Sequence, residues 1–130
     1  IGDRFTNVSG SSAYYKGGIV AYRNEVKHDM LDVKKDTLET YGAVSEETAL
    51  EMAIGVRKKL SSDIGLSTTG IAGPTGGTDE KPVGLIYVGL SHENGEKVYK
   101  FTFTSSRLTN KLMTSQAALN ITRLYLLYGS

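Results

Sequence analysis

The 130-residue sequence contains no cysteine, and this absence removes a whole class of chemistry. Disulfide bridges, thiolate metal ligands and a cysteine nucleophile are all excluded. The absence is compatible with a reducing cytosol, and we expect a cytoplasmic protein. A chain of this length can bury a core without covalent staples, so we expect one domain over residues 1–130.

Neither sign of charge is in excess. Fifteen Lys and Arg residues stand against fourteen Asp and Glu residues, which gives a formal net charge of +1, and the two signs are interspersed. Nucleic acids and anionic membranes select basic clusters, so we expect neither as a partner. No apolar run approaches the roughly 20 residues of a membrane span, and the first residues do not resemble a signal peptide. The expected partner is a small molecule.

Common metal and cofactor motifs are also missing. The two histidines, His28 and His92, lie far apart and have no Glu-x-x-His partner, so we expect no metal site. A GxSxG elbow is absent. A P-loop needs Lys after its last glycine, whereas Thr78 follows Gly77, and the glycine spacing does not fit the dinucleotide fingerprint. We therefore expect no cofactor.

Both prolines and a cluster of glycines fall in one stretch, GIAGPTGGTDEKPVG, from Gly70 to Gly84. Apolar runs on each side predict a strand, a long irregular loop and a second strand. Glycines accept positive φ and let main-chain N–H groups approach a ligand closely, so the loop is predicted to cradle an anion or an oxyanion. The alternative is a long β connection with turn residues and no ligand.

The remaining elements follow from hydrophobic periodicity, caps and turns. Helices on both faces of the predicted sheet give a layered α/β domain, and the final hairpin makes that sheet mixed. The apolar C-terminus is predicted to pack against several neighbours or another subunit, so we expect a homo-oligomer. The predicted elements are a helix end over residues 1–8, a central strand over 19–22, a helix capped by Asn24, a helix capped by Ser45 and running to Leu60, strands over 63–69, 83–90 and 96–104 with an Asn94-Gly95 turn, and a helix from Arg107 to Leu127.

Lys27 falls in the first turn of the helix that Asn24 is predicted to cap. A lysine there faces the positive end of the helix macrodipole, and burial would disfavour its charge further. Both effects lower its pKa from about 10.4 and would leave a neutral amine that can act as a base. The alternative is a solvated surface lysine.

Three segments together resemble one known family: GSSAYYKGGIVAYRNEVK, YGAVSEETALEMAIGVRKKL and TGIAGPTGGTDEKPVGLIYVGL. They are similar to the C-terminal domain of the competence-induced protein CinA, a family that also includes stand-alone nicotinamide mononucleotide deamidases. The similarity runs from about Thr6 to the end, and its most specific part is GIAGPxGGxxxKPVG. It implies a three-layer α/β/α domain with a mixed sheet. It also implies hydrolysis of nicotinamide mononucleotide to nicotinate mononucleotide and ammonia, in pyridine nucleotide recycling.

The resemblance also implies site residues. The family's A-Y-x-N tyrosine falls on Tyr22 and its N-E-x-K lysine on Lys27, the expected catalytic pair. The family nucleophile, a serine in a Glu-Ser-Cys-Thr-Gly-Gly segment, has no counterpart here. The resemblance places it upstream of Ile1 with a first strand and helix that are missing from this chain. The implied substrate-binding residues are Thr69, Gly70, Ala72, Gly73, Gly76, Gly77 and Arg107.

Two functions from different classes remain open at this point. The first is an amidohydrolase with a Ser-Lys mechanism. The second is a catalytically inert nucleotide-binding relative, or a fragment of a CinA protein, that keeps the pocket without the nucleophile. In the family a separate N-terminal domain often precedes this one, and such a partner domain is open here. Whether the glycine loop serves as an oxyanion hole or as a phosphate site is also open.

Overall fold

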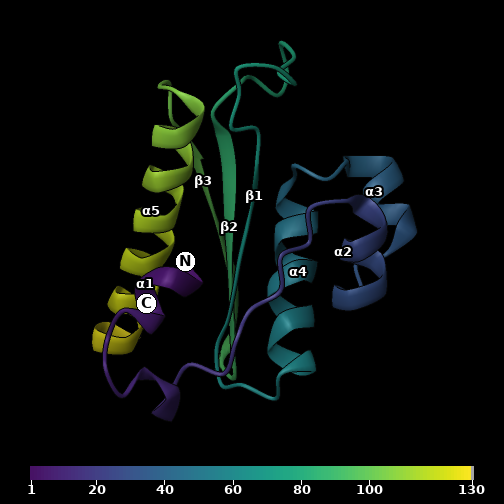
Figure 1. Ribbon diagram of the computed structural model, residues 1–130. Helices are drawn as coiled ribbons and strands as arrows, with labels where there is room; N and C mark the ends of the chain where they lie inside the picture. Colours follow the sequence, from purple (N-terminus) through teal and green to yellow (C-terminus); the bar gives the residue numbers. More distant parts are fainter. Residues whose placement is uncertain (130) are drawn as a thin grey trace.

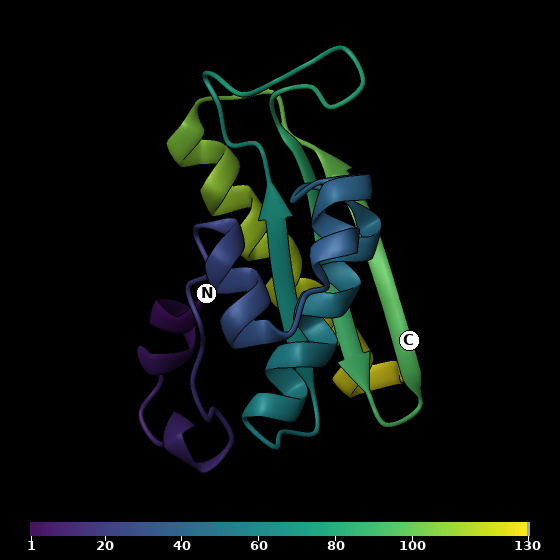
Figure 2. The same ribbon diagram turned by 90° about the vertical axis from the view of Figure 1, so that its right-hand side faces the viewer.

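The computed structural model describes residues 1–129. They form three layers, with one sheet between two layers of helices (Figure 1). Helix α5 covers one face of the sheet, and α4 covers the other with α2 and α3 packed outside it (Figure 2). The predicted α/β/α layering is confirmed. The elements are α1 (Gly2–Thr6), η1 (Ser11–Ala13), α2 (Asn24–Leu31), α3 (Lys35–Tyr41), α4 (Glu46–Lys59), β1 (Gly65–Gly70), β2 (Leu85–His92), β3 (Gly95–Thr102) and α5 (Arg107–Tyr128).

The sheet has the order β1-β2-β3 and is antiparallel at both pairings. Along β1 the register runs from Gly65 opposite Ser91 to Gly70 opposite Ile86. The predicted Asn-Gly hairpin joins β2 to β3, and its Gly95 has φ +137°, which a residue with a side chain rarely adopts. The long glycine-rich connection therefore lies at one end of the sheet and the tight hairpin at the other.

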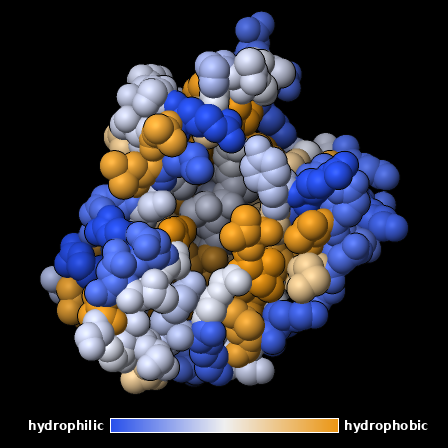
Figure 3. All heavy atoms as spheres, in the orientation of Figure 1, coloured by the Kyte–Doolittle hydropathy of each residue, from blue (hydrophilic) through white to orange (hydrophobic). Residues whose placement is uncertain are grey.

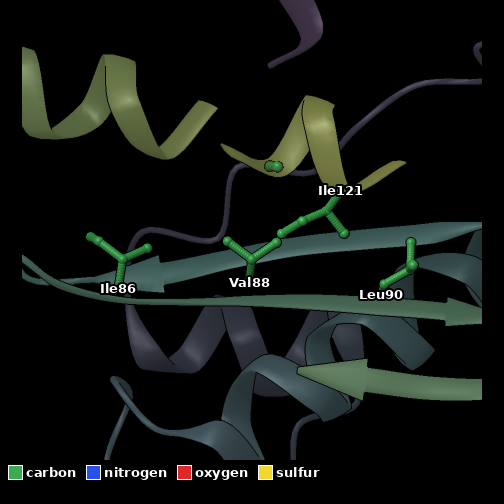
Figure 4. Close-up of a cluster of buried hydrophobic side chains, with 5 residues drawn as sticks. Ile86, Val88, Leu90 and Ile121 are labelled. Carbon is green, nitrogen blue, oxygen red and sulfur yellow. The ribbon is translucent and has the colours of Figure 1, made fainter. Parts of the chain in front are cut away.

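Side-chain alternation along β2 builds the core under α5. Ile86, Val88 and Leu90 point to that face and pack with Ala118 and Ile121 of the helix (Figure 4). All five side chains are buried, and successive strand residues point to opposite faces. Every second residue of β2 therefore faces α5, while the residues between them face α4.

Helix α4 approaches the other face very closely. Its predicted N-cap is confirmed, since the Ser45 side chain accepts a hydrogen bond from the Thr48 N–H. Ala49 and Ala53 are fully buried against the sheet, as their helical spacing predicted. A Cβ at Gly89 would lie 2.5 Å from the Ala49 carbonyl oxygen, so the strand must carry glycine there. Small residues on both sides let the helix backbone rest directly on the strands.

The predicted central strand over residues 19–22 is wrong. These residues have no hydrogen-bonded strand neighbour among residues 1–129, so the described sheet is antiparallel and not mixed. The segment alternates, with Ile19 and Ala21 packed toward the core of α2 and α4, while Val20 is 90% exposed. An apolar run of this length is compatible with a paired strand or with an extended segment packed against helices. The sequence alone does not say which strand would pair with it.

Two helix starts also differ from expectation. Arg23, not Asn24, is the N-cap of α2, and Asn24 is the first helical residue. Helix α3 was not predicted, since its sequence KDTLETY has a weak apolar pattern. A residue of α4 stabilises this helix: the Glu51 carboxylate accepts hydrogen bonds from the Lys34 N–H at 2.8 Å and the Thr37 hydroxyl at 2.6 Å. No helix among residues 1–129 is long and apolar enough to span a membrane.

Substitution of Gly55 by alanine tests the contact between α2 and α4. In an ordinary helix interior this change stabilises by about 1 kcal/mol. Here a Cβ on Gly55 would overlap the Leu31 carbonyl oxygen of α2. We therefore expect Gly55→Ala to lower the free energy of unfolding by about 2 kcal/mol, the usual size of an overpacking penalty, measured by urea unfolding. Lys58→Ala on the exposed side of α4 is the control, and a stabilised Gly55→Ala protein would contradict the packing.

Candidate active site at the glycine-rich loop

Residues 71–84 rise above one end of the three layers as an irregular loop (Figures 1 and 2). The base of the loop is closed by backbone hydrogen bonds from the Ile71 N–H to the Leu85 carbonyl and from the Gly84 N–H to the Ile71 carbonyl. Near its tip, the Lys81 N–H donates to the Thr78 hydroxyl at 3.0 Å. The loop is therefore anchored where it leaves the sheet and closed again by a turn further out.

The start of α5 holds the first part of the loop. Ser106 caps this helix by accepting a hydrogen bond from the Thr109 N–H. One turn of side chains then reaches the loop backbone: Arg107 Nη1 donates to the Gly73 carbonyl at 2.9 Å, and Asn110 Nδ2 donates to the Ala72 carbonyl at 3.0 Å. Two successive carbonyls of the loop are thus fixed by two side chains of one helix.

Gly73 requires the absence of a side chain. Its φ is +84°, and a Cβ there would overlap the side chain of Val83 on the returning arm of the loop. The residue is buried, yet no acceptor for its N–H is found among the described residues. Gly73 therefore offers a main-chain donor at a sheltered position beside the Arg107 guanidinium.

Tyr22 brings the segment before α2 to the same place. Its hydroxyl accepts a hydrogen bond from Arg107 Nη2 at 3.5 Å, although the residue is 79% exposed. Tyr22 and Arg107 come from opposite helical layers of the molecule. Below the loop, the surface between these layers is hollowed over the open edge of the sheet (Figure 3), where β1 is the edge strand.

Lys27 is buried, with 6% of its surface exposed, which overturns the alternative of a solvated lysine. Its Nζ donates to the carbonyls of Ala21 at 3.0 Å and Tyr22 at 3.4 Å. Burial lowers its pKa below the ordinary lysine value, because the charged form loses hydration. A neutral amine has two N–H donors and one lone pair, so two carbonyls satisfy its donors and leave the lone pair free to accept a proton.

Four other predicted site residues serve packing or lie apart. Thr69 donates its hydroxyl to the Ala43 carbonyl at 2.7 Å, which ties β1 to the segment before α4. Gly70 makes room for the Ile86 side chain. Gly76 and Gly77 are exposed in the outer part of the loop and make none of the contacts that join it to α5. Substrate contact at these positions stays a prediction, as it does for the cluster around Arg107.

Asn110 is the residue that sequence reasoning missed. It is fully buried and bonds to both the Ala72 and Ser105 carbonyls while its Oδ1 accepts from the Ser105 N–H. The available signal was its position three residues after Arg107, which places both side chains on one face of the helix. No group of three or more His, Cys, Asp or Glu side chains within residues 1–129 is placed to hold a metal ion.

The fold and this cluster define a small α/β/α domain whose polar groups gather where a glycine-rich loop meets the end of the sheet. The model of the CinA C-terminal domain family matches residues 1–126. The chain therefore belongs to the CinA C-terminal domain family.

Related proteins and solved structures agree with this assignment. A competence-damage inducible protein of Halothermothrix orenii is 60% identical over 119 residues, which are 91% of this chain and 29% of that protein. The structure of the competence/damage inducible protein CihA from Agrobacterium tumefaciens has a TM-score of 0.91 and 39% identity, covering 93% of this chain and 74% of that one. The competence damage-inducible protein A (ComA) structure from Klebsiella pneumoniae has a TM-score of 0.94 and 26% identity, covering 99% of this chain and 80% of that one. The chain thus spans less than a third of the length of the first of these relatives.

Replacing Lys27 by methionine tests its burial through stability. Because the pKa of Lys27 is lowered in the folded state, the unfolded chain binds more protons between that lowered pKa and about 10.4, and stability rises with pH across this window. Lys27→Met removes the free-energy cost of burying an amine that is protonated in the unfolded chain. We expect its advantage in unfolding free energy over the wild type to be larger at pH 7 than at pH 10, as measured by urea unfolding. The exposed Lys35→Met is the control, and an advantage that does not change with pH would contradict the lowered pKa.

Proposed function

We propose that the protein containing this chain is an amidohydrolase that converts nicotinamide mononucleotide to nicotinate mononucleotide and ammonia. The observation that carries the proposal is Lys27, a buried amine held by the carbonyls of Ala21 and of Tyr22, whose hydroxyl in turn bonds to Arg107. The family resemblance supplies the substrate and the nucleophile class. Since the relatives are much longer than this chain, the proposal concerns the whole protein.

In the first step the neutral Lys27 amine accepts the hydroxyl proton of a serine from the family's Glu-Ser-Cys-Thr-Gly-Gly segment. The serine oxygen then attacks the carboxamide carbon and forms a tetrahedral intermediate with a negatively charged oxygen. Burial lowers the pKa of Lys27, which favours the neutral amine that this step needs. A surface lysine would be protonated and could not accept the proton.

In the second step the carbon–nitrogen bond breaks and the leaving amine takes the proton from the Lys27 ammonium, so ammonia departs. Water then attacks the acyl-enzyme, again with Lys27 as the base, and the serine leaves with the returned proton. The products are nicotinate mononucleotide and the free enzyme. Lys27 thus alternates between base and acid, and no other charged group is required for the proton balance.

Arg107 and Tyr22 are placed to hold the substrate. Arg107 uses one nitrogen on the Gly73 carbonyl and another on the Tyr22 hydroxyl, and a guanidinium has five N–H donors. The remaining donors of this exposed side chain are available to an anion, and Arg binds phosphate well through paired hydrogen bonds. The Tyr22 hydroxyl can donate to the substrate while it accepts from Arg107.

A second candidate is a nucleotide-binding relative without catalysis. The groups that favour it are the exposed Arg107 guanidinium, the Tyr22 hydroxyl and the Gly73 N–H, since none of them needs a nucleophile in order to bind a nucleotide. This candidate keeps the binding residues and loses the covalent route. Ammonia release distinguishes the two functions.

The decisive variant of the whole protein is Lys27→Arg. A guanidinium stays protonated at any working pH and cannot accept the serine proton. We expect both Lys27→Arg and Lys27→Met to lower turnover by about 10²–10⁴-fold, the usual contribution of general-base catalysis, with substrate affinity changed only severalfold. Release of ammonia from nicotinamide mononucleotide measures turnover, and Lys35→Arg is the control. Near-normal turnover in Lys27→Arg would show that the lysine supplies only charge.

The isolated 130-residue chain gives a further test of the nucleophile. It carries the proposed base but no serine of the family motif, so we expect negligible ammonia release from it and substantial release from the whole protein. Intact mass must first establish that the short preparation contains only these residues. Robust turnover by the short chain would overturn the serine assignment and implicate Ser9, Ser11, Ser12 or direct attack by water.

A further inference from the structure

Asn110 is a buried polar side chain whose hydrogen bonds fix the direction of a carbonyl group in the loop. Its Nδ2 holds the Ala72 carbonyl at 3.0 Å, and its other bonds to Ser105 fix the orientation of the amide group. The side chain has 0% exposure, so water does not compete for these bonds. The Ala72 carbonyl is therefore held in one direction by the start of α5.

That carbonyl shares its peptide plane with the N–H of Gly73. In a trans peptide the C=O and N–H point in opposite directions, so fixing one fixes the other. The Gly73 N–H has no acceptor among the described residues, while the Gly73 carbonyl is taken by Arg107 at 2.9 Å. Asn110 and Arg107 together leave one oriented donor next to a cationic side chain.

We propose that Asn110 is a positioning residue that aims the Gly73 N–H at the phosphate of the substrate, where Arg107 supplies the positive charge. This inference rests on the proposed function and extends it to one main-chain donor and the side chain that orients it. Asn110 itself does not touch the substrate. Its effect passes through the Ala72–Gly73 peptide, which is the plane that its amide holds.

The layout favours the phosphate over the reacting carbonyl as the group bound at Gly73. Lys27 Nζ lies against the carbonyls of residues 21 and 22, on the α2 side. Among the hydrogen bonds of residues 1–129, the link from Gly73 to that side runs through Arg107 and then through the hydroxyl at the far end of the Tyr22 side chain. A mononucleotide likewise separates its reacting carboxamide from its phosphate by a ring and a ribose. A phosphate next to a guanidinium and a free N–H also gains charge-assisted hydrogen bonds.

The test uses inorganic phosphate as the probe and the Gly73 amide as the reporter. In a ¹H–¹⁵N titration of the wild-type whole protein, we expect phosphate to shift the Gly73 signal more than that of Gly95, which lies in the hairpin at the opposite end of the sheet. An unmoved Gly73 signal would overturn the proposal. This measurement needs no variant, so it decides the question even where a substituted protein does not fold.

Asn110→Asp then removes the donor to Ala72 while keeping the shape of the side chain. We expect phosphate to bind about tenfold more weakly, the factor that corresponds to the loss of one good hydrogen bond. Leu108→Asp is the matched control, because it adds the same charge to the same helical turn at a residue that is 77% exposed. Equal weakening by the two variants would mean that charge alone acts, and would overturn the positioning role.

Kinetics separate this inference from the proposed function. If Asn110 acts through phosphate binding, Asn110→Asp should raise KM for nicotinamide mononucleotide and leave kcat within about twofold, because binding is lost equally in ground and transition states. A fall in kcat with unchanged KM would overturn the phosphate assignment. A whole protein that binds phosphate at Gly73 and releases no ammonia would overturn the proposed function alone. Ammonia release with an unmoved Gly73 signal would overturn this inference alone.

Discussion

The close approach of α4 to its neighbours is the constraint on which the rest of the structure depends. On one side Gly89 lets the α4 backbone rest against the sheet, and on the other Gly55 lets the end of α2 rest against α4. With no side chain between them, the sheet, α4 and α2 have little freedom to slide past one another. Because α2 carries Lys27, the same contacts set the position of the buried amine relative to the sheet and to the loop at its end.

The cluster at the loop is assembled from groups that are individually weak binders. Tyr22 and Arg107 are exposed side chains, and Gly73 contributes only backbone. They form a candidate site because the start of α5 lies against the first part of the loop, where one helical turn reaches two successive loop carbonyls. Lys27 differs from them, since its chemistry comes from burial and not from a charged neighbour. The proposed function thus assigns binding and proton transfer to opposite layers, which meet at the Tyr22 hydroxyl.

Local patterns predicted most of the fold correctly. The helical stripe and Ser45 cap of α4, the Asn-Gly hairpin and the helix beginning at Arg107 all depend on neighbours within one or two turns, and all are present. The errors fall on segments whose secondary structure depends on contacts with residues distant in sequence. Helix α3 depends on Glu51, a residue of the next helix. The run over residues 19–22 has no strand partner within the described part of the chain, residues 1–129, although its composition suggested one.

For the site, the sequence by itself determined the residue types: a lysine early in a helix, an arginine at the start of α5 and a glycine-rich loop between two strands. Family membership also follows from the sequence, since ordered motifs extend along nearly the whole chain. Only the tertiary structure decided that Lys27 is buried, that Thr69 bonds to Ala43 and that Asn110 holds the loop. Burial and hydrogen-bond partners are properties of packing between segments distant in sequence, and periodicity and local motifs do not encode which segments will meet.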